Sequence, residues 1–309
     1  MEKRKIEDLN LLDDFLFQEL ISREKVGEEV CRILLQTILN QPVGKVKVVT
    51  QKAVLPVDPN LHGIRMDAYI EAVTGELGQV NNVELEPDIY DIEPNKVREQ
   101  EYLPKRTRYY HAMIDSKLLD AGISYDRMKN VVIIMILPYD PFGGNRMMYT
   151  VCNRCMEDPD IPYDDGMKKI YLYTKGSVGN TSQRLREMLQ YIENSVVDNV
   201  TNEELATIHE YVNEVKHDKE VGIQYMKSWE HDAMMRAEGR AEGIEEGRAE
   251  GKTYIVALIR KKCKKSLSVS EIAEILELPE HEIQIVIDRI NAFPDEDDRQ
   301  IAMRLLEEE

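Results

Sequence analysis

The sequence has few cysteines and no long apolar run, and both absences limit what the chain can be. Four cysteines in 309 residues are too few for a disulfide framework, so a reducing, cytoplasmic environment is expected. No apolar stretch reaches the roughly 18 residues that a membrane helix needs. The first residues, MEKRKIEDLN, are charged and lack the apolar core of a signal peptide. We therefore expect a cytoplasmic protein without a membrane span.

The chain also lacks an excess of basic residues. Its 40 Lys and Arg are outnumbered by 58 Asp and Glu, which gives a net charge of −18. Because non-specific DNA binding is mainly phosphate neutralisation by Lys and Arg, this balance argues against a protein that coats nucleic acid. It is compatible with a metal-dependent nuclease that uses a local basic strip and bound cations. Any affinity for DNA is expected to be modest and salt-sensitive.

Several common catalytic motifs are missing. No glycine-rich phosphate loop of the Walker or dinucleotide type occurs, and no spacing identifies a Ser-His-Asp or Cys-His arrangement. Cys152 and Cys155 have CxxC spacing, but a zinc site needs a second ligand pair, and a thioredoxin-like site needs the motif to open a helix. His62 and His111 each stand alone. We interpret them as structural histidines, with membership of an acidic site as the alternative.

The N-terminal half alternates between helical and extended patterns. Apolar residues at helical spacing predict a helix from about Leu9 to Asn40 with a break around Ser22 to Lys25. A second helix is predicted over roughly Arg98 to Leu119. The predicted strands are Val46–Leu55, Ile64–Val73, Val80–Glu86, Val131–Leu137, Met147–Cys152 and Lys169–Tyr173. This order predicts an α/β fold in which a mixed sheet is flanked by helices.

From Gln183 onward the pattern is almost entirely helical. Residues 236–252, RAEGRAEGIEEGRAEGK, repeat every four residues with glycine at the fourth position. Four-residue spacing places the glycines along one slowly drifting stripe of a helix. Because each glycine costs about 1 kcal/mol against alanine in a helix, the segment is either a charged linker or a closely packed helix–helix seam. We expect a homo-oligomer assembled through this helical C-terminal region.

The last part, Thr253–Glu309, is predicted to be a small helical unit with two short helices around a Leu278–Pro279 turn. Ser270 is the expected N-cap of the first helix. The arrangement resembles a helix-turn-helix. Its second helix carries acidic residues that disfavour insertion into a DNA groove, so we favour a role in packing or oligomerisation, with DNA docking as the alternative. The predicted organisation is an α/β core over 1–178, a helical extension over 179–235, a repeat helix or linker over 236–252, and this unit over 253–309.

Two acidic residues on adjacent predicted strands form the candidate site. If a short turn at Thr74–Leu77 joins the strands, Asp67 lies opposite Glu84 on one face of the sheet. Two facing carboxylates repel each other unless a cation or a proton lies between them. A hard divalent ion, Mg²⁺ or Mn²⁺, suits such oxygen ligands and would activate water for attack on a phosphate. An ordinary solvated polar face is the alternative.

A basic and aromatic segment follows this predicted hairpin. Lys105, Arg106 and Arg108 stand beside Tyr109 and Tyr110. Cations next to aromatic rings are typical of surfaces that bind a nucleic-acid backbone and its bases. The segment predicts a DNA-contacting surface, unless the tyrosines are buried and the cations are merely solvated.

These segments together resemble a known family. GIRMDAYIEA at 63–72, NVELEPD at 82–88, LPKRTRYYHAMID at 103–115 and the opening LNLLDDFLFQELI at 9–21 are similar to the PD-(D/E)XK nuclease family transposases, relatives of the bacterial recombination-promoting nucleases. The resemblance covers residues 8–235. It implies a restriction-endonuclease-like fold and Mg²⁺-dependent cleavage of DNA phosphodiesters.

The resemblance also implies roles for single residues. Asp67 matches the metal-binding Asp, Glu84 matches the Asp/Glu of the motif, and Asp14 matches an acidic position of the opening helix that would reach the metal. Glu86 stands at the third position, where Lys or Gln is usual. A lysine there would orient the attacking water and offset negative charge, whereas Glu86 would bind a second metal or act as a base. Lys105 is the candidate for a displaced lysine.

Two functions follow from these patterns. The first is a metal-dependent DNA endonuclease of the transposase-associated, recombination-promoting type, in which Asp67 and Glu84 hold Mg²⁺ (or Mn²⁺) and Glu86 assists. The second is a catalytically degenerate nuclease-fold protein that acts as a DNA-binding or protein-interaction module. The absence of a lysine beside Glu86 is the feature that separates them.

Overall fold

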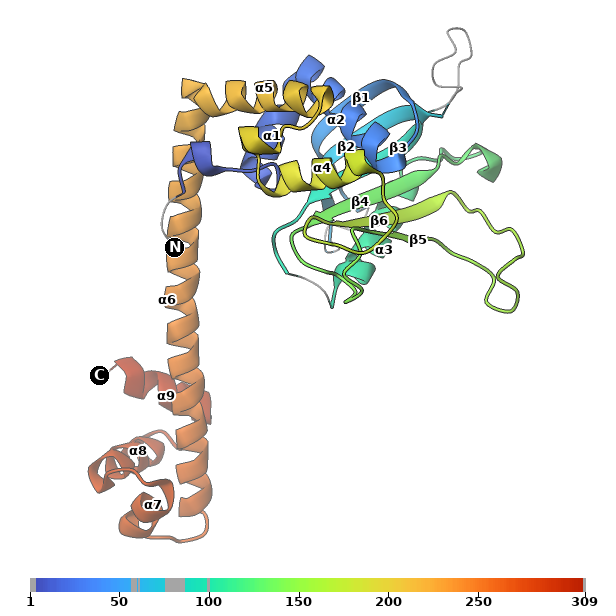
Figure 1. Ribbon diagram of the computed structural model, residues 1–309. Coiled ribbons are helices and arrows are strands. Elements are labelled where there is room, and N and C mark those ends of the chain that lie inside the picture. Colours follow the sequence, from blue (N-terminus) through green and yellow to red (C-terminus); the bar gives the residue numbers. More distant parts are fainter. Residues whose placement is uncertain (1–3, 57–59, 61, 76–86, 99–100, 308–309) are drawn as a thin grey trace. The chain divides into compact units, whose positions relative to one another are not determined.

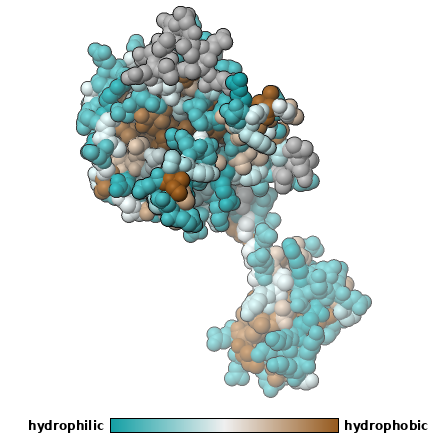
Figure 2. Space-filling view, turned by 90° about the vertical axis from the view of Figure 1, so that its right-hand side faces the viewer, coloured by the Kyte–Doolittle hydropathy of each residue, from teal (hydrophilic) through white to brown (hydrophobic). Residues whose placement is uncertain are grey.

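A computed structural model describes residues 4–56, 60, 62–75, 87–98 and 101–307 of the chain. Its internal contacts divide the chain into two compact units, residues 1–226 and 227–309. Most of the surface in the view of Figure 2 is hydrophilic, in keeping with the net charge of −18. None of the helices in the described part of the chain has the length and apolar character that a membrane crossing requires.

The described part of the first unit contains one mixed sheet. Its strands are β1 (Val43–Val54), β2 (Ile64–Thr74), β3 (Asp88–Pro94), β4 (Val131–Leu137), β5 (Met148–Val151) and β6 (Met167–Tyr173), in the order β1-β2-β3-β4-β6-β5. Strand β2 is antiparallel to both β1 and β3, strands β3, β4 and β6 run parallel to one another, and β5 is antiparallel to β6. The prediction of a mixed sheet flanked by helices is confirmed.

The partner of β2 differs from the predicted one. Strand β2 pairs with β1 on one side and with β3 on the other, with Tyr69 opposite Asp91, so the predicted register that places Asp67 opposite Glu84 is wrong. The sequence DIYDIEP of β3 was not recognised as a strand because its acidic residues interrupt the apolar pattern, although nearly all of it is buried. The segment Val80–Glu86, with Glu84 and Glu86, lies outside the described residues.

Helices cover both faces of this sheet. They are α1 (Asp14–Ile21), α2 (Glu24–Leu39), α3 (Leu103–Asp115), α4 (Gln183–Glu193) and α5 (Glu203–His217), with short 3₁₀ turns at Ile6–Asp8, Tyr125–Arg127 and Val197–Asn199. The predicted break in the first helix is confirmed between α1 and α2. Helices α1, α2, α4 and α5 pack on one face of the sheet, and α3 packs on the other (Figure 1).

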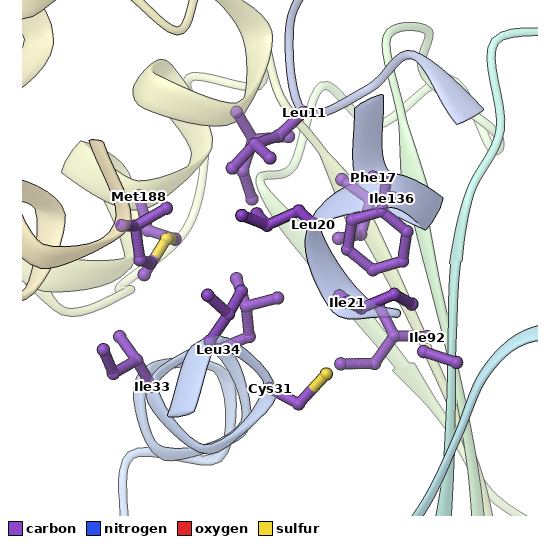
Figure 3. Close-up of a cluster of buried hydrophobic side chains, with 14 of the residues drawn as sticks. Leu11, Phe17, Leu20, Ile21, Cys31, Ile33, Leu34, Ile92, Ile136 and Met188 are labelled. Atoms are coloured by element: carbon purple, nitrogen blue, oxygen red, sulfur yellow. The ribbon is translucent and has the colours of Figure 1, made fainter. Parts of the chain in front are cut away.

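The core on the first face fixes α1 against the sheet (Figure 3). Phe17 of α1 and Leu34 of α2 belong to one buried cluster with Ile92 of β3 and Ile136 of β4, and each of these side chains is at most 1% exposed. Burying a side chain of this size contributes about 1.5–3 kcal/mol. This packing places the first residue of α1, Asp14, near the end of the β2–β3 pair.

The second unit is helical. It contains most of α6 (Lys219–Cys263), followed by α7 (Val269–Leu276), α8 (Glu280–Ala292) and α9 (Asp298–Glu307). Val256 of α6, Ile272 of α7 and Ile283 of α8 are fully buried in a cluster of their own. The glycine repeat at 236–252 lies within α6 and is helical, and α9 is a helix that the sequence interpretation did not separate.

The N-cap of α7 is Ser268 rather than the predicted Ser270. The Ser268 hydroxyl accepts a hydrogen bond from the Glu271 backbone N–H, and the Glu271 carboxylate accepts one from the Ser268 N–H at 2.7 Å. We expect Ser268→Ala to lower the stability of the second unit by about 1 kcal/mol, because this reciprocal cap is lost. Urea denaturation measures the change, with Ser270→Ala as the control. Equal losses in the two variants would contradict the assignment.

Candidate functional site

Four acidic side chains meet at the end of the β2–β3 pair, and we call them the acidic cluster: Asp14, Asp67, Asp91 and Glu93. Ala68 of β2 pairs with Ile92 of β3. Because the strands are antiparallel, Asp67 and Glu93 are the next pair of opposite residues. The Asp67 backbone N–H donates a hydrogen bond to Glu93 Oε1 at 2.8 Å. Asp91 lies two residues before Glu93 and therefore on the same face of β3. Asp14, at the start of α1, lies close enough for its charge to act on Asp67.

The cluster extends from the surface into the protein. Asp14 is exposed and Asp67 is half-buried, whereas Glu93 is 2% exposed and Asp91 is 0% exposed. Acidic side chains are almost never fully buried unless they are paired or bind a cation. The burial of Glu93 and Asp91 therefore does not fit an ordinary solvated polar face.

Burial and mutual repulsion raise the pKa of each member. Burial, followed by the charge of Asp14, raises the pKa of Asp67 to about 6. Burial, followed by the charge of Asp67, raises the pKa of Glu93 to about 8. Burial and the charges of Glu93 and Asp67 hold the pKa of Asp91 well above its ordinary range, and burial with the neighbouring Asp13 raises the pKa of Asp14. A proton or a cation bound here would relieve this repulsion.

Two cationic side chains compensate the cluster in part. Arg106 of α3 donates to Glu93 Oε2 at 3.1 Å, and its charge lowers the pKa of the cluster's carboxyl groups. Lys96 follows β3, pairs with Asp13 and lowers the pKa of Asp14. The acidic cluster thus lies beside two positive charges that come from different elements of the fold.

Several buried polar atoms around the cluster have no hydrogen-bond partner among the described residues. They are both carboxylate oxygens of Asp91, both amide atoms of Gln18 and the Asn95 amide nitrogen. Asp91 and Glu93 can share a hydrogen bond only when one of them is protonated, which is a further cause of the raised pKa of Asp91. An unpaired buried polar group costs about 1–3 kcal/mol. A water molecule or a ligand would therefore be stabilised at this position.

The predicted site residues are only partly brought together. Asp67 and Asp14 belong to the acidic cluster, while Glu84 and Glu86 lie outside the described residues. Glu93 has the position beside Asp67 that the sequence interpretation assigned to Glu84. The missed signal was DIYDIEP, a short segment of mixed apolar and acidic residues that begins two residues after the predicted third strand.

The predicted DNA-contacting strip is divided between two sides of α3. Arg106 points toward Glu93, whereas Lys105, Arg108 and Tyr109 are exposed. The Tyr109 hydroxyl donates to the backbone carbonyl of His62 at 2.5 Å. The cations that lower pKa values in the acidic cluster are therefore Arg106 and Lys96, not the displaced lysine expected at position 105.

The rival metal and histidine sites gain no support. Cys152 and Cys155 lie on the segment between β5 and β6, where no helix begins. His111 is buried against the Lys168 carbonyl, and burial lowers its pKa to about 4. Within the described ranges, no group of three or more His, Cys, Asp or Glu side chains is arranged to hold a metal ion. In the acidic cluster, Arg106 and the Asp67 N–H engage the Glu93 carboxylate.

The chain was compared with models of known protein families, with curated proteins and with solved structures, and none of them matches.

Proposed function

We propose that this protein is a metal-dependent nuclease that hydrolyses DNA phosphodiester bonds, built on a restriction-endonuclease-like core. The observation that carries the proposal is the position of Asp67 and Glu93 at the end of adjacent strands, where the charge of Asp67 raises the pKa of Glu93. Two such carboxylates lower their repulsion by sharing a divalent ion. The mixed sheet with helices on both faces supports the fold part of the proposal.

Asp67 and Glu93 would hold Mg²⁺ or Mn²⁺, with Asp14 completing the site from α1. The unpaired oxygens of Asp91 support this assignment, because they are buried hydrogen-bond acceptors behind Glu93 that no described residue satisfies. To bind the ion, Glu93 would exchange its contact with Arg106. A bound ion supplies an activated water and stabilises negative charge on the phosphate.

The chain's own cationic and amide side chains would bind the phosphate and orient the attacking water. Arg106, once displaced from Glu93, would pair with the phosphate oxygens, and Lys96 would add a second positive charge nearby. Asn95 stands two residues after Glu93, at the third position of the motif. Its Oδ1 accepts a hydrogen bond from the Val97 N–H at 2.8 Å, which holds the side chain in place and leaves the amide nitrogen without a partner. That nitrogen would orient the attacking water.

The exposed side of α3 is the proposed DNA surface. Lys105 and Arg108 would contact backbone phosphates, and Tyr109 would stack against a base or sugar. Because the whole chain carries a charge of −18, the affinity is expected to be modest and to fall as the salt concentration rises.

One observation favours a second function. The Glu93 carboxylate is already engaged by Arg106 and the Asp67 N–H, and no metal-holding group of three is formed in the described ranges. These contacts would equally suit a degenerate nuclease fold, in which the buried charges form a structural network and the chain acts as a DNA-binding or protein-interaction module. Calorimetry with Mn²⁺ separates the two, because only the nuclease should bind the ion in a manner that Asp67→Asn abolishes.

The direct test is cleavage of supercoiled plasmid with Mg²⁺ or Mn²⁺. We expect nicking by the wild-type protein, loss of nicking with a chelator, and loss with Asp67→Asn. The matched control is Glu71→Gln, which neutralises another carboxylate on the same strand and face and should leave activity unchanged. Equal nicking by the wild type and Asp67→Asn, or equal loss in both variants, would rule out the acidic cluster as the catalytic site.

A further inference from the structure

The backbone of Gln51 is left-handed although the residue belongs to strand β1. Its φ angle is 50°. Residues other than glycine rarely adopt this conformation, because the Cβ atom then comes too close to the following carbonyl oxygen. Asparagine is the residue that tolerates it most often after glycine. A glutamine at this position therefore costs conformational free energy that a glycine would avoid.

The other left-handed residues of this kind stand at the ends of elements. Among the described residues, those with a positive φ that are not glycine are Gln51, Asn40, Asn145, Ser266 and Glu277. Asn40 and Glu277 are the C-cap residues of α2 and α7, where a left-handed residue commonly ends a helix. Asn145 and Ser266 lie between elements. Within the described strands Gln51 alone has this conformation, so neither a helix end nor a turn accounts for it.

Gln51 stands directly across from Asp67 of the acidic cluster. Strands β1 and β2 keep one register on both sides of this residue, as shown by their pairs Thr50–Ala68 and Lys52–Met66. The residue opposite Gln51 is therefore Asp67. The Gln51 side-chain Nε2 donates a hydrogen bond to Asp67 Oδ1 at 3.0 Å. The glutamine thus contacts the acidic cluster from a strand that carries none of its four acidic residues.

Gln51, Asp67 and Glu93 form one row across three neighbouring strands. In the described sheet β1 lies at the edge and β2 lies between β1 and β3 (Figure 1). Asp67 accepts a hydrogen bond from Gln51 through its carboxylate and donates one to Glu93 through its backbone N–H. A donor on Oδ1 fixes the rotation of the Asp67 carboxylate. It leaves Oδ2 and the second lone pair of Oδ1 for another ligand.

We propose that Gln51 is a positioning residue that holds the Asp67 carboxylate in the orientation that binds the metal ion. This role rests on the proposed function, in which Asp67 is a metal ligand. Carboxylates that bind metals are themselves hydrogen-bonded, and loss of such a partner typically costs about 10- to 100-fold in metal affinity or activity. An amide suits the role, because it donates to the carboxylate without adding a positive charge that would repel the ion.

The strained backbone agrees with this role. Left-handed residues other than glycine persist where the surrounding structure imposes them, and they are concentrated at functional sites. A glycine at position 51 would relieve the strain but would leave Asp67 Oδ1 without this donor. The side chain of Gln51 therefore serves the acidic cluster at a cost to the stability of β1.

Two substitutions separate positioning from stability. Gln51→Met keeps the length of the side chain and the left-handed backbone but removes the donor. Gln51→Gly removes the donor and relieves the backbone, so in urea denaturation this variant should be at least as stable as the wild type. Both variants of the full chain should bind Mn²⁺ about tenfold or more weakly than the wild type. Calorimetry with Mn²⁺ as the added ligand measures the affinities.

Asn40→Gly is the matched control, because it relieves another left-handed residue of the same unit, with a φ of 51°. Asn40 precedes the end of β1 that pairs with Thr74, at the opposite end of β2 from the acidic cluster. Its affinity for Mn²⁺ should equal that of the wild type. A merely structural role of Gln51 predicts variants at position 51 that lose stability and keep their affinity for Mn²⁺. That pattern overturns the proposal.

The affinities also separate this role from the proposed function itself. If the wild type binds Mn²⁺ and both Gln51 variants bind it equally well, the role of Gln51 is wrong and the nuclease site stands. A wild type that binds no Mn²⁺ overturns both. In nicking assays, the Mn²⁺ concentration for half-maximal cleavage should rise in both variants by the same factor as the dissociation constant. An unchanged half-maximal concentration would contradict a role in holding Asp67 for the ion.

Discussion

Replacing Glu93 with glutamine is expected to reduce divalent-ion-dependent DNA cleavage by about 10³-fold or more, since a metal ligand contributes several kcal/mol to the transition state. The same change is expected to stabilise the metal-free protein at pH 8. The two effects have one cause, because Glu93 is a carboxylate that the fold buries beside Asp67 at a cost to stability. Glutamine has the same shape and can still accept a hydrogen bond from the Asp67 N–H, but it carries no charge.

The pH dependence of this stabilisation follows from the raised pKa. Glu93 ionises near its ordinary value of 4.5 in the unfolded chain and at about 8 in the folded protein. Between these values the folded state holds more protons, so stability falls as the pH rises from about 4.5 to about 8. Glu93→Gln removes this loss and should gain on the order of 4 kcal/mol at pH 8 and about 1 kcal/mol at pH 5.

Nicking assays and urea denaturation at the two pH values measure both effects, with Glu71→Gln as the matched control. Full cleavage by Glu93→Gln would exclude this residue as a metal ligand. A variant that is less stable than the wild type at pH 8 would show that the Glu93 charge is compensated in the folded protein.

Replacing Arg106 with methionine is expected to destabilise the metal-free protein by about 3 kcal/mol at pH 8. Removal of one partner from a buried ion pair leaves the other charge uncompensated and typically costs about 3–5 kcal/mol. The Arg106 side chain is 29% exposed, which places the expected loss at the lower end. At pH 5 the loss should be much smaller, because a group with a pKa of about 8 is then protonated.

A double-mutant cycle shows whether Arg106 acts through Glu93. In a Glu93→Gln background, Arg106→Met should have little effect at pH 8, since no buried charge remains at that position. Arg108→Met is the control, because Arg108 is exposed on the same helix. A loss that is independent of pH and of Glu93 would mean that Arg106 stabilises the protein through its packing alone.

Sequence patterns predicted much of the fold because they report local preferences. The fully apolar run VVIIMIL is β4 at its predicted ends, and the break between α1 and α2 lies where the helical pattern weakens. Asp67 was found because it alternates with apolar residues on a strand that has one polar face. These features depend on neighbours a few residues apart, which periodicity records.

The partner of Asp67 could not be found in the same way. The pairing of β2 with β3 joins segments that are separated in the sequence, so periodicity does not record it. The alternating segment nearest to β2, Val80–Glu86, was taken as its partner, which predicted the wrong register for Asp67. A buried strand that carries Asp91 and Glu93 also violates the rule that buried positions are apolar. Such a violation is typical of functional sites, where local preference and tertiary structure disagree.

By itself, the sequence determined the mixed α/β class, most strands and helices, the helical C-terminal part and the four-residue repeat of α6. Each of these depends on the spacing of residues that are close together in the sequence. Only the tertiary structure decided that Glu93 stands beside Asp67, that Arg106 rather than Lys105 faces them, and that Asp91 is buried behind them. These relations depend on strand register and on the rotation of α3 over the sheet, which packing between distant segments sets.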